Sequence, residues 1–409
     1  MLKSKNIWVI SELYYPEETS TGHYMTKIAE ALAKELSVKV LSSKPNYASR
    51  GIYVPRREIH NNVEIYRCFS TTFNKNNLFL RIINIVTISL SIFITCIIKM
   101  RRGDIVLVVT NPPLLPYIAV FACLMRKSKC LIRIDDVYPD ILVVSDIISR
   151  NGILFNMLNR STKYLYKKAD CIITLGRDMR SLVANKMNGN NNSINVITNW
   201  ADVDEVSPIP KATNNLLKEL GLFDKFVVQC AGNIGRVQGI ECLFAVAKQL
   251  KVHKDIHFLF IGSGAKKEWL VEQIEKSNMK NITVLGNRPR SDQVNFLNAC
   301  DIAVVSLMPG MLGVSVPSRM YNIFAAGKPI IAIVDENSEV ALTVEEERLG
   351  WVATPDDPAK IADIILMAKS HPALIEEMGK KARDMAESKY SYKKILNAYL
   401  TIMDGMVKS

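Results

Sequence analysis

The alternation of apolar and polar positions along the chain predicts an α/β protein. Short apolar runs, typical of buried parallel strands, alternate with segments whose apolar residues recur every three or four positions, as in helices. The first strand, residues 7–10, precedes a helical pattern at Met25, Ile28, Ala29 and Leu32. The same alternation of strand and helix patterns continues through most of the chain, so we expect doubly wound parallel sheets.

Two strand–glycine–helix units follow one another in the second half of the chain. The apolar residues 226–231 run into the glycine-containing turn 232–239, and residues 257–261 run into the turn 262–264. In parallel sheets, ligands bind at the carboxyl ends of the strands, where glycines let the backbone approach a diphosphate and helix N-termini favour its charge. Glycine turns also occur for packing alone, and the turns by themselves leave both interpretations open.

Together with residues 284–289 and the block from Pro317 to Pro329, these turns resemble the donor half of a family 4 retaining glycosyltransferase. Within that family the chain is most similar to enzymes of O-antigen and colanic-acid assembly, in particular WbuB-type L-fucosaminyltransferases. The resemblance spans nearly the whole chain. It implies a GT-B architecture, in which two Rossmann-like doubly wound domains face a central cleft and a C-terminal helix crosses back to the first domain.

The length of 409 residues is enough for two domains of ordinary size. The proline-containing stretch 199–210 is the expected linker. We therefore expect an acceptor-side domain over residues 1–200 and a nucleotide-sugar-binding domain over residues 201–386. Residues 387–409 would form the helix that packs on the first domain.

Three residues are candidates for catalysis. Charge that develops on a diphosphate leaving group is best met by arginine, lysine and backbone amides, which favours Arg236 in the first glycine turn and Arg319 ahead of a helix. Asp136 follows an apolar strand, and the resemblance places it beside the acceptor, whose hydroxyl it would position or deprotonate. The alternatives are solvated arginines and an aspartate that caps the next helix.

The resemblance also implies contacts with the donor. The uracil ring is expected near Asn287 and Arg288, and Gln238 stands where relatives usually have a second cation. The paired glutamates of the family fall on Val314 and Asn322, so neither carboxylate is present. Asn322 would then hydrogen-bond a ribose hydroxyl, and the main chain of Val314, in an exposed loop, would meet the sugar. The other donor-binding candidates are Gly22, Gly232, Asn233, Gly235, Gly262, Gly264, Ser315 and Ser318; for Gly22 a simple helix-capping turn is the alternative.

The positive charge of the chain is confined to its first half. Residues 1–200 contain 27 Lys and Arg against 14 Asp and Glu, whereas residues 201–409 contain 25 against 26. A basic half suits nucleic acid or anionic lipid. The sequence has no recognised nucleic-acid motif, and its basic residues flank apolar runs, so we expect a membrane surface as the partner and no nucleic acid.

The apolar run lies in residues 78–102, which carry no charge between Arg81 and Lys99 and end in Arg101 and Arg102. Three interpretations are open: a transmembrane helix, a fully buried core helix, and a helix partly sunk into the membrane interface. The last is expected, because a crossing would place two parts of one sheet on opposite sides of the membrane.

Eight scattered cysteines without a C-x-x-C pair suit buried thiols in a reducing compartment. The N-terminus shows no signal-peptide pattern, so the protein is expected in the cytoplasm, bound peripherally to the inner face of the cytoplasmic membrane. The resemblance implies a UDP-linked donor, a polyprenyl-diphosphate-linked acceptor, retention of configuration and no metal or other cofactor. A sugar-nucleotide 2-epimerase and a non-catalytic nucleotide-binding scaffold are the alternative functions.

Overall fold

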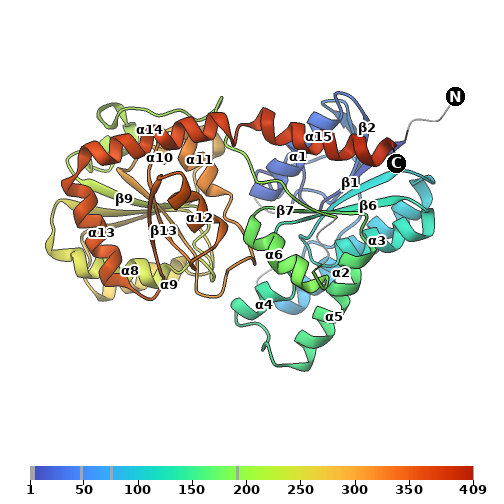
Figure 1. The fold of residues 1–409 in the computed structure, drawn as a ribbon, viewed down its shortest axis with the longest axis horizontal. Helices are drawn as coiled ribbons and strands as arrows, with labels where there is room; N and C mark the ends of the chain where they lie inside the picture. Colours follow the sequence, from blue (N-terminus) through green and yellow to red (C-terminus); the bar gives the residue numbers. More distant parts are fainter. Residues whose placement is uncertain (1–4, 47–48, 74–76, 190–192, 409) are drawn as a thin grey trace. The chain divides into compact units, whose positions relative to one another are not determined.

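The computed structural model describes residues 5–46, 49–73, 77–189 and 193–408. It divides into two compact units. Unit 1 contains Met1–Asp140, Ser149–Thr198 and Ile395–Ser409, and unit 2 contains Ile141–Ile148 and Asn199–Lys394. The main boundaries between the units follow residues 198 and 394, whereas the expected domain limits were residues 200 and 386. Each unit is an α/β unit around a mainly parallel sheet, as expected (Figure 1).

Unit 1 is built on an eight-stranded sheet with the order β3-β4-β2-β1-β5-β6-β7-β8. All neighbours are parallel except β3 and β4. The strands are β1 (Asn6–Ile10), β2 (Ser37–Ser42), β3 (Arg57–His60), β4 (Val63–Arg67), β5 (Ile105–Val109), β6 (Lys129–Ile134), β7 (Cys171–Thr174) and β8 (Ile194–Val196). The central strand β5 is apolar at every position, as expected for a strand of a parallel sheet with helices on both faces.

The helices of unit 1 lie on the two faces of this sheet (Figure 1). One face carries α1 (Ser20–Leu32) and α15 (Tyr392–Lys408), and the other carries α2 (Leu78–Lys99), α3 (Leu115–Arg126), α5 (Ile153–Lys168) and α6 (Arg177–Lys186). The four apolar positions expected to form one side of α1 are all buried, which confirms the helical pattern.

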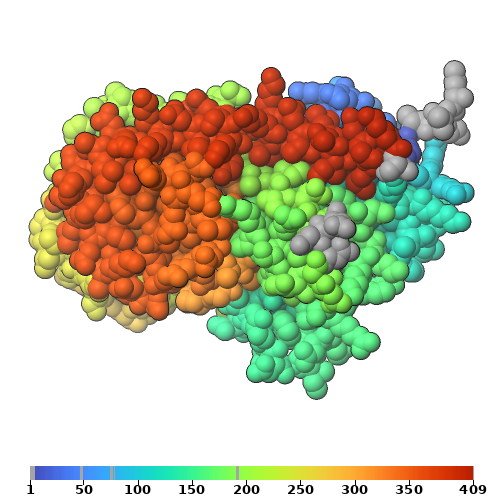
Figure 2. Space-filling view, in the orientation of Figure 1, coloured from blue at the N-terminus to red at the C-terminus, as the bar shows by residue number. Residues whose placement is uncertain are grey.

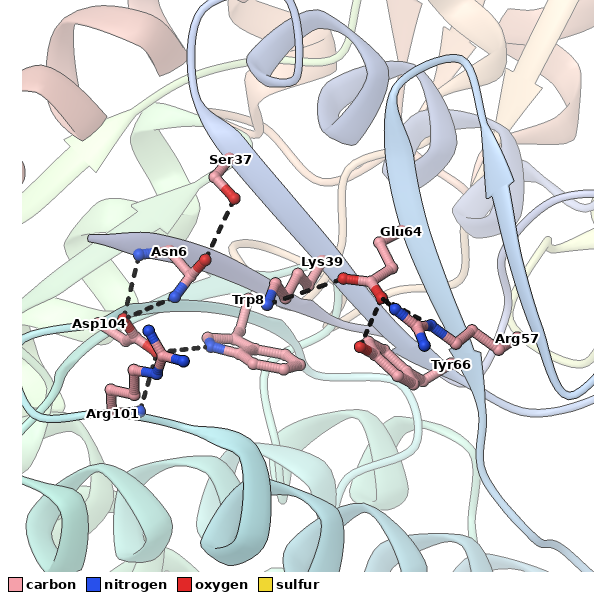
Figure 3. Close-up of polar contacts among 9 residues, drawn as sticks. All are labelled: Asn6, Trp8, Ser37, Lys39, Arg57, Glu64, Tyr66, Arg101 and Asp104. Carbon is pink, nitrogen blue, oxygen red and sulfur yellow. Dashed lines mark hydrogen bonds and ion pairs between the residues drawn. The ribbon is translucent and has the colours of Figure 1, made fainter. Parts of the chain in front are cut away.

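A buried carboxylate ties the start of β5 to β1 (Figure 3). Asp104 accepts hydrogen bonds from the backbone N–H of Asn6 (3.0 Å), the indole N–H of Trp8 (2.8 Å) and the backbone N–H of Arg101 (2.9 Å). A carboxylate removed from water needs such donors, and here they join two neighbouring strands. The bonds fix these two strands relative to each other at the centre of the sheet.

The apolar helix α2 is not a fully buried core helix, so that alternative was wrong. Its core-facing side, with Ile88, Ile92 and Cys96, is buried against unit 1. A second side presents large apolar side chains to solvent at a spacing of three or four residues. These exposed residues are Phe79, Ile82, Val86, Leu90, Ile94 and Ile98. α2 is long and apolar enough to cross a membrane by length and composition.

Unit 2 contains a six-stranded, fully parallel sheet with the order β11-β10-β9-β12-β13-β14. The strands are β9 (Phe226–Ala231), β10 (Ile256–Ile261), β11 (Ile282–Leu285), β12 (Ile302–Ser306), β13 (Ile330–Ile333) and β14 (Gly350–Ala353). The main helices are α8 (Ile240–Gln249), α9 (Lys267–Lys276), α11 (Arg319–Ala325), α12 (Glu339–Glu346), α13 (Pro358–Ser370) and α14 (Pro372–Ser388), and the short ones are α4 (Asp140–Val144), α7 (Asn215–Glu219) and α10 (Gln293–Leu297).

The order of these strands reverses between β9 and β12, since β10 and β11 extend the sheet to one side and β13 and β14 to the other. Such a switch point opens a crevice at the carboxyl ends of the two strands. The turn after β9 and the segment that leads from β12 to α11 therefore frame the expected donor site.

The last helix, α15, begins in unit 2 and continues in unit 1, where residues 395–408 pack. Leu396, Tyr399 and Met403 are buried there, and the Lys129 ammonium donates to the carbonyl of Met406 (2.9 Å). In the space-filling view its residues, drawn in red, border the blue N-terminal residues of unit 1 (Figure 2). The return of the C-terminal helix expected for a GT-B protein is thus present.

Candidate functional site

The two glycine turns of unit 2 pack directly against each other. A β-carbon on Gly262 would lie 1.8 Å from the carbonyl oxygen of Gly232, and one on Gly264 would lie 2.4 Å from that of Ile234. The backbone N–H of Gly232 donates to Ile261 (2.8 Å) and that of Ile234 donates to Ser263 (2.9 Å). Gly262 and Gly264 are therefore required for packing, because no larger residue fits between the turns.

Arg319, the first residue of α11, lies against the first turn. A β-carbon on Gly232 would lie 3.3 Å from its guanidinium carbon, and Nη1 donates to the carbonyl of Ala231 at the end of β9 (3.3 Å). Burial raises the pKa of the neighbouring Cys230 thiol although Arg319 lies beside it. The thiol therefore stays neutral, and no described carboxylate forms an ion pair with Arg319.

Arg236 is exposed in the same turn, and within the described residues its side chain has no hydrogen bond or ion pair. The glutamine that replaces the usual second cation, Gln238, is buried beneath the turn, with Oε1 2.5 Å from the position of a β-carbon on Gly235. The first turn therefore offers one unpaired cation, and Arg319 offers a second from a different element. An anion at the end of β9 would find both charges available.

Asn233 and Gly235 belong to the same turn. The side-chain amide of Asn233 spans the gap between the turns, since Nδ2 lies 2.7 Å from a β-carbon position on Gly235 and Oδ1 lies 2.5 Å from that on Gly264. The pairing of these glycines with one asparagine fixes the shape of the turn. Their contact with a donor stays a prediction.

The expected base-binding residues follow β11. Asn287 is exposed, whereas the guanidinium of Arg288 is paired with Asp292 (2.8 Å) and lies 3.8 Å from Glu219. The side chain of Arg288 is thus engaged within unit 2, which leaves the backbone of this loop as the expected reader of the base edge.

The loop expected to meet the sugar is less exposed than predicted. Val314 is buried, and its N–H donates to the carbonyl of Met311 (2.9 Å). Asp335 holds the loop by accepting from the N–H groups of Gly310 (3.2 Å) and Leu312 (2.9 Å). The prediction of an open loop was therefore wrong at Val314, whose N–H is already used. Ser315 and Ser318 are half-buried before α11.

The assignment of Asn322 to a ribose hydroxyl is contradicted. Asn322 is buried, its Oδ1 accepts from the backbone N–H of Asp202 (2.8 Å) and its Nδ2 donates to the Asp202 carboxylate (2.9 Å). The same carboxylate accepts from the Trp200 indole (2.9 Å) and is paired with Arg290. Asn322 thus anchors the linker to α11, a role that spacing within one helix did not reveal.

In unit 1, Asp136 lies in the loop after β6. Its backbone N–H and that of Asp135 both donate to the hydroxyl of Thr110 (3.3 and 3.0 Å). Asp136 lies four residues before Asp140, the first residue of α4, which is too far for a helix cap. The capping alternative is therefore excluded, and the half-buried carboxylate stands at the carboxyl edge of the sheet.

The neighbouring Asp135 links this loop to α1 and α15. It pairs with the buried guanidinium of Arg133 (2.8 Å), which also donates to the Tyr399 hydroxyl of α15 (2.7 Å). Thr21 donates to its other oxygen (3.4 Å). The structure thus brings Asp136 close in the fold to the first turn of α1, which contains Gly22. The apolar strand alone gave no signal for the Arg133–Tyr399 pair.

Gly22 is the third residue of α1, and the helix cap is Thr19, whose hydroxyl accepts from the N–H of Gly22 (3.2 Å). A β-carbon on Gly22 would lie 2.5 Å from the carbonyl oxygen of Glu17. The glycine is therefore explained by packing at the helix start, and a role toward the donor stays a prediction.

Among the described residues, no group of three His, Cys, Asp or Glu side chains is placed to hold a metal ion. All eight cysteines are free, and all but Cys242 are buried.

Known proteins resemble this chain in sequence and in fold. The family model described as glycosyl transferases group 1 matches residues 214–385, which contain both glycine turns and Arg319. The probable glycosyltransferase WbjE of Pseudomonas aeruginosa is 31% identical over 365 residues, which cover 88% of each chain. The putative colanic acid biosynthesis glycosyl transferase WcaI of Escherichia coli is 20% identical over 96% of this chain and 98% of its own.

Among solved structures, Anabaena Alr3699/HepE in complex with UDP-glucose has a TM-score of 0.74 at 14% identity, with 98% of this chain and 99% of that chain covered. The two units with parallel sheets therefore have the GT-B architecture. By its sequence, the chain belongs to the glycosyl transferases group 1 family.

Proposed function

We propose that the protein transfers a sugar from a nucleotide donor, with retention of configuration, to a lipid-linked oligosaccharide during polysaccharide assembly. The single observation that carries this proposal is the pair Arg319 and Arg236, two arginines at the carboxyl end of β9 that have no carboxylate partner among the described residues. Colanic acid biosynthesis in the description of WcaI supports the pathway class, and UDP-glucose in the HepE complex supports a UDP-linked donor.

In unit 2 the donor diphosphate binds at the glycine turns. Arg319 and Arg236 neutralise the charge that develops as the diphosphate leaves, and the turn amides add hydrogen bonds. The backbone after β11 reads the uracil ring. Because the cations are supplied by side chains, transfer is expected without a metal ion.

In unit 1, Asp136 positions or deprotonates the acceptor hydroxyl. Its backbone N–H donates to the Thr110 hydroxyl, which holds the main chain of this residue in place before the acceptor binds. The departing phosphate oxygen assists attack on the same face of the sugar, which retains the configuration without a covalent intermediate. N-acetyl-L-fucosamine is the proposed sugar, in line with the resemblance of the chain to L-fucosaminyltransferases.

We further propose that unit 1 docks on the inner face of the cytoplasmic membrane, where a polyprenyl-diphosphate-linked acceptor is found. α2 is 22 residues long, roughly 33 Å at the helical rise, and its exposed apolar side runs from Phe79 to Ile98. Arg101 and Arg102 follow its end. The opposite side of α2 is buried in unit 1, which supports a helix that lies in the interface.

A labelled UDP-sugar offered with and without a polyprenyl-diphosphate-linked acceptor tests the function. Transfer to the lipid fraction only when acceptor is present is the expected result. An epimerised nucleotide sugar in both reactions would identify a 2-epimerase. Tight binding of UDP without any product from a panel of donors and acceptors would identify a scaffold.

A further inference from the structure

The segment before α2 runs back along the helix and is held by its side chains. We name residues 69–73 the strap. Every second backbone N–H of the strap is donated to a polar side chain of α2. The pairs are Phe69 with Ser91 (2.9 Å), Thr71 with Thr87 (3.1 Å) and Phe73 with Asn84 (3.0 Å).

Asn84 makes more of the hydrogen bonds that hold the strap than Thr87 or Ser91 does. Its Nδ2 also donates to the carbonyl of Phe73 (3.0 Å), and its Oδ1 accepts from the hydroxyl of Thr71 (2.7 Å). Asn84, Thr87 and Ser91 are three and four residues apart, so they form one stripe of the helix. Three polar side chains of a largely apolar helix thus accept hydrogen bonds from the backbone of the strap.

The outward side of the strap is aromatic. Phe69 is 70% exposed and Phe73 is 46% exposed, although both lie on a segment whose hydrogen bonds face the helix. In water the opposite arrangement is usual, with polar groups outward and aromatic rings inward. Where water is scarce, irregular backbone is tolerated only if protein groups satisfy it. A backbone that is hydrogen-bonded to α2, together with the outward rings of Phe69 and Phe73, therefore suits a lipid environment.

We propose that the strap is a membrane-insertion element, and that Phe69 and Phe73 enter the acyl region of an anionic bilayer beside the exposed side of α2. This inference rests on the membrane docking proposed above. It adds an apolar contact with lipid that is made by the strap and not by α2. Anionic lipid is the occupant because Arg101 and Arg102 follow the end of α2 and Arg126 ends α3. A second copy of this basic face would be repelled.

Removal of both rings tests the contact. The variant F69S/F73S is compared with F223S, which removes a phenylalanine of unit 2 that is 50% exposed. Binding to phosphatidylcholine–phosphatidylglycerol vesicles is measured by co-sedimentation. Because two rings that would be buried in lipid are removed, F69S/F73S is expected to bind at least about tenfold more weakly than wild type. This difference should persist at high salt, since an apolar contact is not screened by ions. F223S should bind as the wild type does.

Depth is measured by a second experiment that does not depend on loss of binding. In vesicle-bound Phe73→Trp, the emission of the introduced tryptophan is expected to shift to the blue and to be quenched by lipids brominated on their acyl chains. The emission of the tryptophan introduced in Phe223→Trp should stay unquenched. The difference spectrum against wild type removes the four native tryptophans.

If the protein binds vesicles but the emission of the tryptophan introduced in Phe73→Trp stays as in water, insertion of the strap is refuted while membrane docking stands. Equal vesicle binding by F69S/F73S and wild type would do the same. Wild-type protein that ignores these vesicles at low salt would refute docking and strap together. Dimerisation in solution that F69S/F73S abolishes, with vesicle binding unchanged, would make a second copy the partner. Transfer of labelled sugar reports on the glycosyltransferase proposal separately.

Discussion

At the scale of residues, each proposed role depends on which partner a side chain already has. Arg236 and Arg319 have no carboxylate partner among the described residues, whereas Arg288 is paired with Asp292. Asn322 has both ends of its amide engaged by Asp202. Charge that is not neutralised within the protein is available to a ligand, and a saturated amide is not.

Arg319→Ala is expected to lower kcat/KM for the donor, with a loss of roughly 2–4 kcal/mol of transition-state stabilisation, because we propose that the guanidinium faces the leaving group. Steady-state transfer kinetics measure it. Arg180→Ala, which removes an exposed arginine of α6, is the control and should be neutral. Normal kinetics from a folded Arg319→Ala protein would refute the assignment.

Asn322→Ala is expected to lower the free energy of unfolding by about 1–3 kcal/mol, since it leaves the buried Asp202 N–H without its acceptor. Thermal and urea unfolding measure the loss, with the exposed Asn397→Ala as control. The UDP affinity of the folded variant should stay near that of wild type. A large loss of UDP affinity with unchanged stability would restore the ribose contact.

At the scale of elements, α15 helps to hold the loop after β6. The Tyr399 hydroxyl accepts from the guanidinium of Arg133, which pairs with Asp135 next to Asp136. Arg133 is buried, so each of its donors matters. The C-terminal helix is thereby part of the support of the proposed acceptor site.

Tyr399→Phe is expected to cost about 1–3 kcal/mol of stability, because it leaves a buried donor of Arg133 unsatisfied. It should also reduce kcat more than the KM for donor, since the support lies beside Asp136 and not at the glycine turns. Unfolding curves and transfer kinetics are compared with Tyr53→Phe, whose ring is 89% exposed. An unchanged kcat would confine Tyr399 to stability.

A second prediction at this scale concerns β10 and β11, which are joined by His257 Nε2 and the Thr283 hydroxyl (2.8 Å). Burial, with a smaller contribution from Lys225, lowers the pKa of His257 to about 4. Since the unfolded chain binds this proton more tightly, the contribution to stability is complete above the ordinary pKa of about 6.5 and declines as the pH falls toward 4. His257→Asn should flatten the acid limb of stability in that window in urea titrations, and an equally steep limb would contradict the assignment.

At the scale of the whole molecule, the uneven charge and the exposed apolar residues fall in the same unit. Unit 1 carries the basic excess and the exposed side of α2, and the second half of the chain is close to neutral. Charge attraction and apolar burial add for an interfacial helix. The proposed docking therefore involves both.

Replacement of four basic residues by glutamine is expected to release the protein from anionic vesicles without unfolding it. The residues are Arg81, Lys99, Arg101 and Arg102. Each near-surface charge contributes about 1 kcal/mol, and Lys99 less, because its ammonium lies 4.5 Å from the Tyr66 ring.

Four exposed lysines of unit 2 changed in the same way provide the control, which should bind as the wild type does. These are Lys248, Lys254, Lys280 and Lys360. Co-sedimentation at rising salt measures the difference. Wild-type protein that only detergent extracts from vesicles would indicate a spanning helix.

The sequence by itself determined the elements and the family, because these follow from local pattern. The strand of residues 226–231 is β9 residue for residue, and the four apolar positions of α1 are buried. Strand period, helix period and glycine turns are local properties of a chain, and family motifs keep fixed spacings. Arg236 and Asp136 were predicted as site residues in this way, and their roles stay predictions.

Only the tertiary structure decided what each side chain meets. Asn322 is engaged by Asp202, 120 residues away, and Arg319 lies on Gly232 although separate elements carry them. The polar stripe of α2 faces the strap, which no helical period reveals. Partners such as these depend on how elements pack after the chain has folded, because burial selects the hydrogen bonds and ion pairs that survive loss of water.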